Sequence, residues 1–392
     1  MDPIRNPFSP GAGNPPPELV GRFELLQRVQ VSLARVRTGR YDKSLILIGL
    51  RGVGKTVLLN QIKQRADASG YKTILVEAHE RKSLESLLLP PLRSVLFSLD
   101  SIKGNSDKVK RAFRVLRSFL NGVKAKVGEI QIELGVDPEV GTGDSGDLET
   151  DLAELLVAVA DAAADRHTAV ALCIDELQYL SVREFSALIM AIHRVSQQSL
   201  PLILIGAGLP QIIALAGRSK SYSERLFDFP EVDKLDPAGA KEAIRGPLQS
   251  EGVVIEESAL DEIVRLTQGY PYFLQQWGYE TWNLAERSPI TKSEVEAATS
   301  AAIRNLDKNF FRVRFDRLTP RQKEYLRALA ALGAGVHRSG DVSAKLGVES
   351  NSVGPVRDDL IKKGVIYSPR HGDVAFTVPL FDEFMLRAVL EA

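Results

Sequence analysis

The first half of the chain alternates short, continuous apolar runs with segments of helical periodicity. The runs lie at residues 45–48, 73–76, 169–174 and 202–205. Runs of this kind are typical of strands that are buried on both faces of a parallel sheet. Between the first two runs, Leu58, Ile62 and Ala66 recur at helical spacing. Strands that alternate with helices predict an α/β fold built on a parallel sheet.

After residue 226 the strand-like runs stop and the pattern becomes helical. Residues 234–300 read mainly as helices. Residues 318–390 predict three helices followed by a two-stranded hairpin, with a helix-capping box at Thr319–Gln322 and a second helix capped by Ser339. Three helices and a hairpin resemble a winged helix.

A glycine-rich segment, Gly49 to Thr56, follows the first strand and precedes the first helix. It matches the pattern G-x-x-x-x-G-K-[ST], which cradles phosphates in backbone N–H groups at a helix N-terminus. Lys55 would reach the terminal phosphates, and Thr56 would offer its hydroxyl to Mg²⁺. We therefore predict ATP/ADP and Mg²⁺ as cofactors. The nucleotide-binding residues would be Gly49, Arg51, Gly52, Val53, Gly54, Lys55, Thr56 and Val57.

Two acids, Asp175 and Glu176, end the third apolar run. Asp175 would hold Mg²⁺ together with Thr56, and Glu176 would orient or deprotonate the attacking water. Cys173 lies within the same run and is predicted to be core rather than reactive, since no cation nearby in sequence would depress its pKa.

Composition excludes several other classes of protein. The chain has 392 residues, 50 Lys+Arg and 50 Asp+Glu, so its zero net charge gives no sign of a nucleic-acid or membrane-surface protein. One cysteine excludes a disulfide framework and a cysteine-rich zinc module. Residues 1–17 have no signal-peptide core, and the apolar window 200–217 contains proline and glycine typical of a strand and turn. A cytoplasmic protein without a membrane partner is expected.

Charge is nevertheless distributed unevenly. Residues 101–126 hold eight basic side chains and one acid, and residues 127–154 hold nine acids and no Lys or Arg. Either the first block is a basic arm for acidic partners, or the two blocks neutralise each other; the second interpretation is favoured. Gly141 to Gly146 would be a flexible joint before a helix that begins near Asp147.

These motifs resemble the AAA+ superfamily, in particular the origin-recognition-complex-like and archaeal-type ATPases that border on the STAND signalling ATPases. The resemblance covers about residues 17–385. Glu18 to Arg22 is similar to the segment that lines the adenine, which implies roles for Val20 and Gly21. Ser221 to Phe227 is similar to the box that carries the arginine finger, which implies that Arg225 reaches the γ-phosphate of a neighbouring subunit in a homo-oligomer. The alternative is a surface Arg225 paired with Glu224 or Asp228.

The resemblance also implies a domain division. It comprises an irregular N-terminal arm at 1–17, a nucleotide-binding α/β core at 18–232 with a charged insertion at about 101–147, a helical lid at 233–304, and a linker with a winged-helix domain at 305–392.

Two departures from replication initiators suggest slow ATP hydrolysis. Gly206 to Gly208 stands where those proteins usually carry a polar residue, and the lid segment 269–273 has no arginine. That lid segment instead resembles the Gly-x-Pro motif of signalling ATPases, which implies that Pro271 packs near the adenine. The alternative is that Gly269 and Pro271 simply end one helix and start the next.

The partner of the winged helix is left open between double-stranded DNA and a protein. The third helix and the hairpin supply candidate DNA contacts, namely Asn351, Ser352, Arg357, Lys362, Lys363 and Arg370. Residues 318–392 are nearly neutral, with ten basic and nine acidic side chains. The leading hypothesis is a nucleotide-controlled, oligomerising ATPase switch that binds DNA. The alternative is a STAND-like signalling or defence scaffold that uses the module for protein contacts or autoinhibition.

Overall fold

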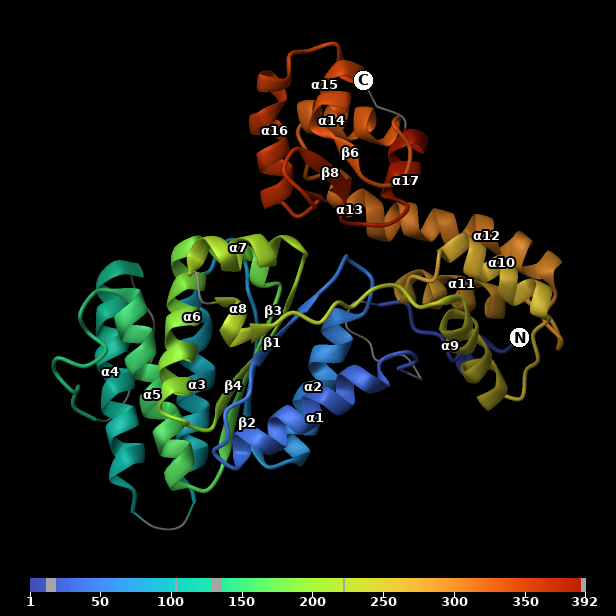
Figure 1. Ribbon diagram of the computed structural model, residues 1–392. Helices are drawn as coiled ribbons and strands as arrows, with labels where there is room; N and C mark the ends of the chain where they lie inside the picture. The colour runs from blue at the N-terminus through green and yellow to red at the C-terminus, as the bar shows by residue number, and fades with distance from the viewer. Residues whose placement is uncertain (12–18, 103–104, 128–135, 221–222, 389–392) are drawn as a thin grey trace. The chain divides into compact units, whose positions relative to one another are not determined.

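The computed structural model describes residues 1–11, 19–102, 105–127, 136–220 and 223–388 (Figure 1). Several residues of the predictions lie outside this set, namely 12–17 of the arm, Glu18, Lys103, 128–135 of the acidic block, Ser221, Tyr222 and Leu390. The chain divides into two compact units. The α/β unit comprises residues 24–48 and 58–231, and the loop-and-lid unit comprises residues 1–23, 49–57 and 232–392.

The α/β unit is built on a five-stranded parallel sheet in the order β2-β3-β4-β1-β5. The strands are β1 (Ser44–Ile48), β2 (Tyr71–Glu77), β3 (Ala169–Asp175), β4 (Leu202–Gly208) and β5 (Phe227–Asp228). Every residue of β1, β3 and β4 is buried, as the continuous apolar runs predicted. The parallel α/β fold is therefore confirmed. Burial raises the pKa of the Cys173 thiol in β3 to about 12, which keeps it protonated at neutral pH.

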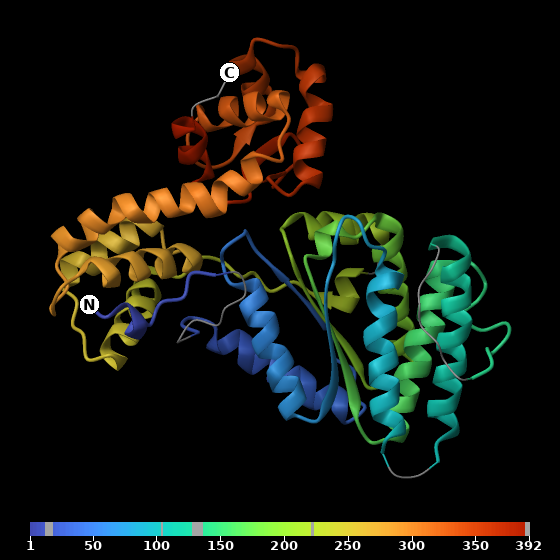
Figure 2. The same cartoon turned by 180° about the vertical axis from the view of Figure 1, so that it is seen from behind.

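Helices cover both faces of this sheet (Figures 1 and 2). On one face lie α1 (Phe23–Arg37) and α2 (Lys55–Ala68). On the other lie α3 (Leu84–Asp100), α5 (Leu148–Asp165) and α6 (Val182–Gln197), with α4 (Asp107–Val127) outside them. The unit also contains α7 (Gln211–Ser219) and α8 (Ser223–Leu226). The apolar window 200–217 forms β4 and most of α7, and among the described residues no helix is both long and apolar enough to cross a membrane.

The charged insertion contributes both core and surface. Helix α4 buries an apolar face that includes Phe119 and Leu120. Its cations pair with acids that follow, since Lys108 lies 2.7 Å from Asp161 and Arg111 lies 2.9 Å from Glu139. Of these two acids only Glu139 belongs to the acidic block, and Glu149 of that block pairs with Lys220, so the blocks neutralise each other in part. The loop expected to be a flexible joint is anchored, because the buried Asp151 carboxylate accepts hydrogen bonds from the backbone of residues 145 and 146.

The loop-and-lid unit contains a bundle of helices in the region 234–300, which the sequence predicted to be mainly helical. They are α9 (Pro237–Ser250), α10 (Glu257–Thr267), α11 (Pro271–Leu284) and α12 (Lys292–Leu306), followed by a π-helical turn, η3 (Asp307–Phe311), and α13 (Arg312–Phe315). The first eleven residues, which include the 3₁₀ turn η1 (Pro3–Arg5), pack on α11. Phe8 is 2% exposed, and a Cβ at Gly278 would lie 2.7 Å from its ring. The Trp282 indole donates to the Asp2 carbonyl.

The C-terminal module, residues 318–388, has one strand and one helix more than predicted. It contains α14 (Pro320–Ala330), β6 (His337–Arg338), α15 (Ser339–Leu346), α16 (Ser350–Lys362), β7 (Ile366–Tyr367), β8 (Asp373–Phe376) and α17 (Phe381–Arg387). Strand β6 pairs with β8, so the sheet has three strands rather than two. The capping box at Thr319 is confirmed, whereas Ser339 is the first residue of α15 rather than its cap. The winged-helix assignment stays an interpretation of this order.

We predict that Phe8→Ala destabilises the lid. Truncating a fully buried phenylalanine costs about 3–5 kcal/mol in free energy of unfolding, because it removes buried area and leaves a cavity. The chain's two tryptophans, Trp277 and Trp282, both lie on α11, so tryptophan fluorescence during urea unfolding reports on this helix. The matched control is Phe23→Ala, since Phe23 is 74% exposed and its loss should cost less than about 0.5 kcal/mol. Equal urea midpoints for the two variants would contradict the prediction.

Candidate nucleotide-binding site

The glycine-rich loop has the backbone conformation that the motif requires. Gly52 and Gly54 have φ of 84° and 91°, a left-handed region in which a side chain is strained. Gly49 is constrained by space instead, because a Cβ there would lie 2.1 Å from the Val232 carbonyl oxygen. Helix α2 begins at Lys55, so the loop ends at a helix N-terminus, where backbone N–H groups and the helix dipole favour an anion.

The ammonium group of Lys55 is bound to backbone carbonyls of the glycine-rich loop. Its side chain is almost entirely buried, and Nζ donates hydrogen bonds to the carbonyl oxygens of Gly49 and Leu50, at 2.9 and 2.8 Å. A bound phosphate would compete with these neutral carbonyls for the ammonium group, and a charge-assisted bond is the stronger one. Thr56 is exposed at the first turn of α2.

The segment predicted to line the adenine lies beside this loop. Val20 and Gly21 pack against residues 235–239, and a Cβ at Gly21 would lie 3.2 Å from the Leu235 side chain. The Arg22 guanidinium donates to the carbonyl oxygen of Val53 at 3.3 Å and to that of Asp233. Burial lowers the pKa of Arg22, and the charge of Asp233 offsets part of that effect. The sequence showed Arg22 only as part of a segment, because its target lies 31 residues away.

The Gly-x-Pro segment also reaches the loop. Gly269 has φ of 77° and lies against Leu235, whose backbone N–H donates to the Gly269 carbonyl at 2.9 Å. Pro271 is the first residue of α11, as the helix-start interpretation expects, and its adenine contact stays a prediction. The next residue, Tyr272, donates its backbone N–H to the Gly52 carbonyl at 3.2 Å. Tyr272 is a loop contact that the sequence did not reveal.

The two acids lie at the end of β3, in the α/β unit. Asp175 is buried, and its carboxylate accepts the backbone N–H of Glu176 at 2.8 Å. Glu176 has a left-handed backbone (φ 53°), which is uncommon for this residue type and often marks a functional position. β1 and β3 end at the same edge of the sheet, because Ile48 pairs with Gly208 and Ile174 with Gly206. The glycine-rich loop follows β1, and Asp175 and Glu176 lie at the end of β3, so both motifs begin at this edge of the sheet.

Arg225, the predicted finger, lies at the opposite edge. It precedes β5, where Phe227 pairs with Ser44 at the start of β1. The side chain of Arg225 is exposed, and Asp228, one of its two expected surface partners, is instead paired with Arg28. Arg225 is therefore remote from Asp175 and Glu176 of its own chain.

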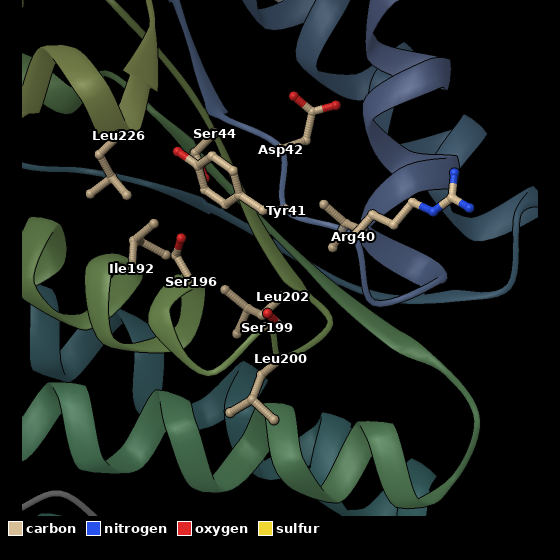
Figure 3. Close-up of a pocket in the computed structure, with 11 residues that line it drawn as sticks. Arg40, Tyr41, Asp42, Ser44, Ile192, Ser196, Ser199, Leu200, Leu202 and Leu226 are labelled. Carbon is tan, nitrogen blue, oxygen red and sulfur yellow. The ribbon is translucent and has the colours of Figure 1, made fainter.

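Two side chains from the segment before β1 hold the backbone at Arg225. The Tyr41 hydroxyl donates to the Arg225 carbonyl and Lys43 Nζ to that of Glu224, both at 3.1 Å. Tyr41 and Leu226 line a cavity of about 20 Å³ (Figure 3), which has room for about one water and not for a nucleotide. Burial, and then the charge of Asp42, raise the pKa of Tyr41, so its hydroxyl stays a donor at neutral pH.

The residues present fit a magnesium ion that is bound mainly through phosphate. Among the described residues, no cluster of three or more His, Cys, Asp or Glu side chains could form a cage for a metal. Mg²⁺ commonly takes one or two protein ligands beside phosphate oxygens and water. Thr56, in the loop-and-lid unit, and Asp175, in the α/β unit, each carry an oxygen of the type that Mg²⁺ prefers, and their sharing of one ion stays a prediction.

Comparison with known proteins identifies two family matches in the chain. Residues 18–205 match the family model described as AAA ATPase domain, and residues 308–385 match a domain of unknown function, DUF8462. A comparison with curated proteins found no match.

Solved structures support the fold. The chain is similar to the Walker-type ATPase of Pyrococcus abyssi, with 17% identity, a TM-score of 0.56, and coverage of 94% of this chain and 96% of that chain. Weaker similarities include the Thermotoga maritima RuvB Holliday junction branch migration motor, with 16% identity, a TM-score of 0.45 and coverage of 91% and 92%. Another is the Aeropyrum pernix Orc1 protein in complex with DNA, with 16% identity, a TM-score of 0.47 and coverage of 95% and 93%. Of these three similarities, only the first has a TM-score above 0.5 and supports the fold.

We predict that Lys55→Ala abolishes tight ATP binding. Loss of one charge-assisted contact to phosphate should raise the dissociation constant for ATP about 100-fold, as measured by titration with a fluorescent ATP analogue. The matched control is Lys63→Ala on the same helix, because Lys63 pairs with Asp67 in solvent and should not affect affinity. Unchanged ATP affinity in Lys55→Ala would contradict the site assignment.

Proposed function

We propose, because residues 18–205 match the family model described as AAA ATPase domain, that the chain is an ATP-hydrolysing switch whose nucleotide state controls its assembly into homo-oligomers. The observation that carries the proposal is the glycine-rich loop, which both the segment 20–22 and Tyr272 contact. Two segments that are distant in sequence from each other and from the loop thus meet at it. Slow turnover is part of the proposal, since the end of β4 has no polar side chain and the lid segment has no arginine. A cytoplasmic location is also part of the proposal.

Each residue has a defined task in the proposed hydrolysis. Lys55 and the backbone N–H groups of the loop bind the phosphates, while Val20, Gly21 and Pro271 pack around the adenine. When bound, Mg²⁺ neutralises charge on the phosphate oxygens, and Thr56 and Asp175 would hold it. Glu176 takes the proton of the attacking water as the bond to the γ-phosphorus forms and ADP leaves.

Arg225 acts in trans in this proposal. A guanidinium stabilises the charge on the transferring phosphoryl group, and Arg225 is exposed at the sheet edge remote from the acids of its own chain. A neighbouring subunit would therefore complete the site. The division into an N-terminal arm, an α/β core, a helical lid and a winged-helix domain stays part of the proposal.

Duplex DNA is the first candidate ligand of the C-terminal module. Helix α16 carries most of the candidate contacts, but two of its cations are already paired with acids. Arg357 lies 3.0 Å from Asp358, and Lys363, which caps the helix, lies 3.1 Å from Asp359. DNA affinity comes mainly from neutralised phosphates, so these pairs weaken the DNA form of the proposal.

A specific contact favours the second candidate, an autoinhibitory module. The backbone N–H of Arg51, in the glycine-rich loop, donates to the Thr377 carbonyl at 3.0 Å, and Arg51 Nε donates to the Gly364 carbonyl at 3.4 Å. Thr377 is fully buried, and its hydroxyl donates to the same Gly364 carbonyl. The end of β8 thus binds the loop that must accept phosphate. A STAND-like scaffold, in which nucleotide exchange releases the module to a protein partner, is the alternative function that this contact supports.

Nucleotide-dependent assembly can be tested with Glu176→Gln, which should bind ATP without hydrolysing it. We expect this variant to form oligomers with ATP and not with ADP, measured as solution mass with and without duplex DNA. A further shift in mass with DNA would support the DNA form of the proposal. An unchanged mass in every condition would contradict the switch.

Trans action is tested by Arg225→Ala against Arg218→Ala, which removes another exposed arginine in the same region. Only the first should remove the rise of specific ATPase activity with protein concentration, by about 10³-fold at saturation if Arg225 is a finger. Nucleotide affinity of the dilute protein should be unaffected. Equal loss of activity at every concentration would argue against a role in trans.

The docked module should retard nucleotide exchange. Arg51→Ala removes the side-chain bond to Gly364, which is worth about 0.5–1.5 kcal/mol, so release of a fluorescent ADP analogue should become about 2–10 times faster. Arg338→Ala, on an exposed cation of β6, is the matched control. Identical release rates for the two variants would contradict an inhibitory contact.

A further inference from the structure

The side-chain amide of Gln178 joins Glu176 to the end of β4. Gln178 lies in a short 3₁₀ turn, η2 (Leu177–Tyr179), that directly follows Glu176. Its Nε2 donates a hydrogen bond to the Glu176 carboxylate, and its Oε1 accepts the backbone N–H of Leu209 at 3.1 Å. Leu209 is fully buried and directly follows β4. One amide therefore connects the predicted catalytic carboxylate to the backbone of the central sheet.

The two neighbours determine which way the amide faces. The N–H of Leu209 needs an acceptor, and the carboxylate of Glu176 needs a donor. A flipped amide would place its NH₂ against the Leu209 N–H and its oxygen against the carboxylate, and both contacts would be repulsive. The donor of Gln178 is thereby directed at Glu176.

The glycines of β4 make room for this turn. A Cβ at Gly206 would lie 2.3 Å from the Leu177 side chain, and a Cβ at Gly208 would lie 2.6 Å from Gln178 Oε1 and 2.1 Å from Ile212. A larger residue at either position would displace η2 or Ile212. The end of β4 therefore has no room for a polar side chain beside the acids of β3, because Leu177, Gln178 and Ile212 fill that space. The Gln178 amide is the polar group at this position.

We propose that Gln178 is a positioning residue for ATP hydrolysis, holding the Glu176 carboxylate in the orientation that accepts the proton of the attacking water. The inference rests on the proposed function, in which water bonds to the γ-phosphorus, the bond to the β–γ bridging oxygen breaks, and ADP leaves with that electron pair. Gln178 forms and breaks no bond in this step. If the glutamate side chain is already ordered, no rotamer entropy is lost in ordering it when the transition state forms. This lowers the barrier and corresponds to roughly a 10-fold gain in rate.

The anchor favours a positioning role over a restraint that must be released. Gln178 Oε1 is held by the backbone of the buried Leu209, directly after β4, rather than by another side chain, and Asp175 holds the backbone of Glu176 from the other side. A group fixed at both ends to the sheet keeps one geometry through the cycle. Gln178 should therefore influence the rate of the chemical step and leave nucleotide affinity alone.

Gln178→Glu is the sharpest test, because it keeps an oxygen for the Leu209 N–H and replaces only the donor that faces Glu176. We expect kcat for ATP hydrolysis to fall about 10-fold or more, while the dissociation constants of ATP and ADP change less than about twofold. Gln197→Glu, which makes the same charge change at an exposed position on α6, is the matched control and should retain wild-type kcat. If the charged variant does not fold, as judged by thermal melting, Gln178→Ala, which removes both the donor to Glu176 and the acceptor for Leu209, should lower kcat in the same way.

Three results would overturn the inference. They are an unchanged kcat in Gln178→Glu, a raised kcat, which would identify a restraint, and a loss of affinity for ATP alone, which would identify a direct phosphate contact. Glu176→Gln, assayed beside these variants, separates the inference from its premise. If Glu176→Gln keeps wild-type turnover, the proposed function fails; if it stops turnover while Gln178→Glu does not, the positioning role alone fails.

Discussion

Parallel pairing of fully buried strands is the constraint on which the candidate site depends. The backbone groups of β1, β3 and β4 are shielded from water, so they must satisfy one another through the ladder. Parallel pairing then requires that all three strands end at one edge. The glycine-rich loop leaves β1 there, and Asp175 and Glu176 end β3 there. The parallel direction of the strands therefore places the two predicted motifs at the same edge of the sheet.

Glycine occupies three positions where a neighbouring atom lies too close to the backbone for any side chain. Gly49 lies against the Val232 carbonyl, Gly269 lies against that of Leu235, and Gly208 lies against Gln178 and Ile212. In each case a residue that appears uninformative in sequence determines how near a functional segment can lie. The absence of a polar residue at the end of β4 is thus a consequence of packing, because the polar group is supplied by the following turn of β3.

The sequence predicted the features that depend on local pattern, and missed those that depend on distant contacts. The motif at 49–56 and the apolar run that ends in Asp175 each contain their own evidence in a few adjacent residues. β6 is only two residues long and shows no periodicity, so its pairing with β8 was not visible. Arg22, Tyr272 and Gln178 act on groups that the fold brings near them, and a single sequence does not show such a partner. The sequence showed the two charge blocks of the insertion, but it could not show which of their side chains form ion pairs, because that depends on the tertiary structure.

The docking of Phe8 against Gly278 has a consequence for the order in which the molecule can be completed. The two residues are 270 positions apart (278 − 8). At ribosomal rates of about 5–20 residues per second, Phe8 has no binding surface for roughly 10–50 s after it is synthesised. Residues 24–48 and 58–231 are all made within that interval, so the α/β unit can collapse before the helix that Phe8 packs against has been synthesised. In a growing chain residues 1–11 can therefore pack in place only after residues 24–48 and 58–231 have been made, and the Phe8 side chain lacks its binding surface during this interval.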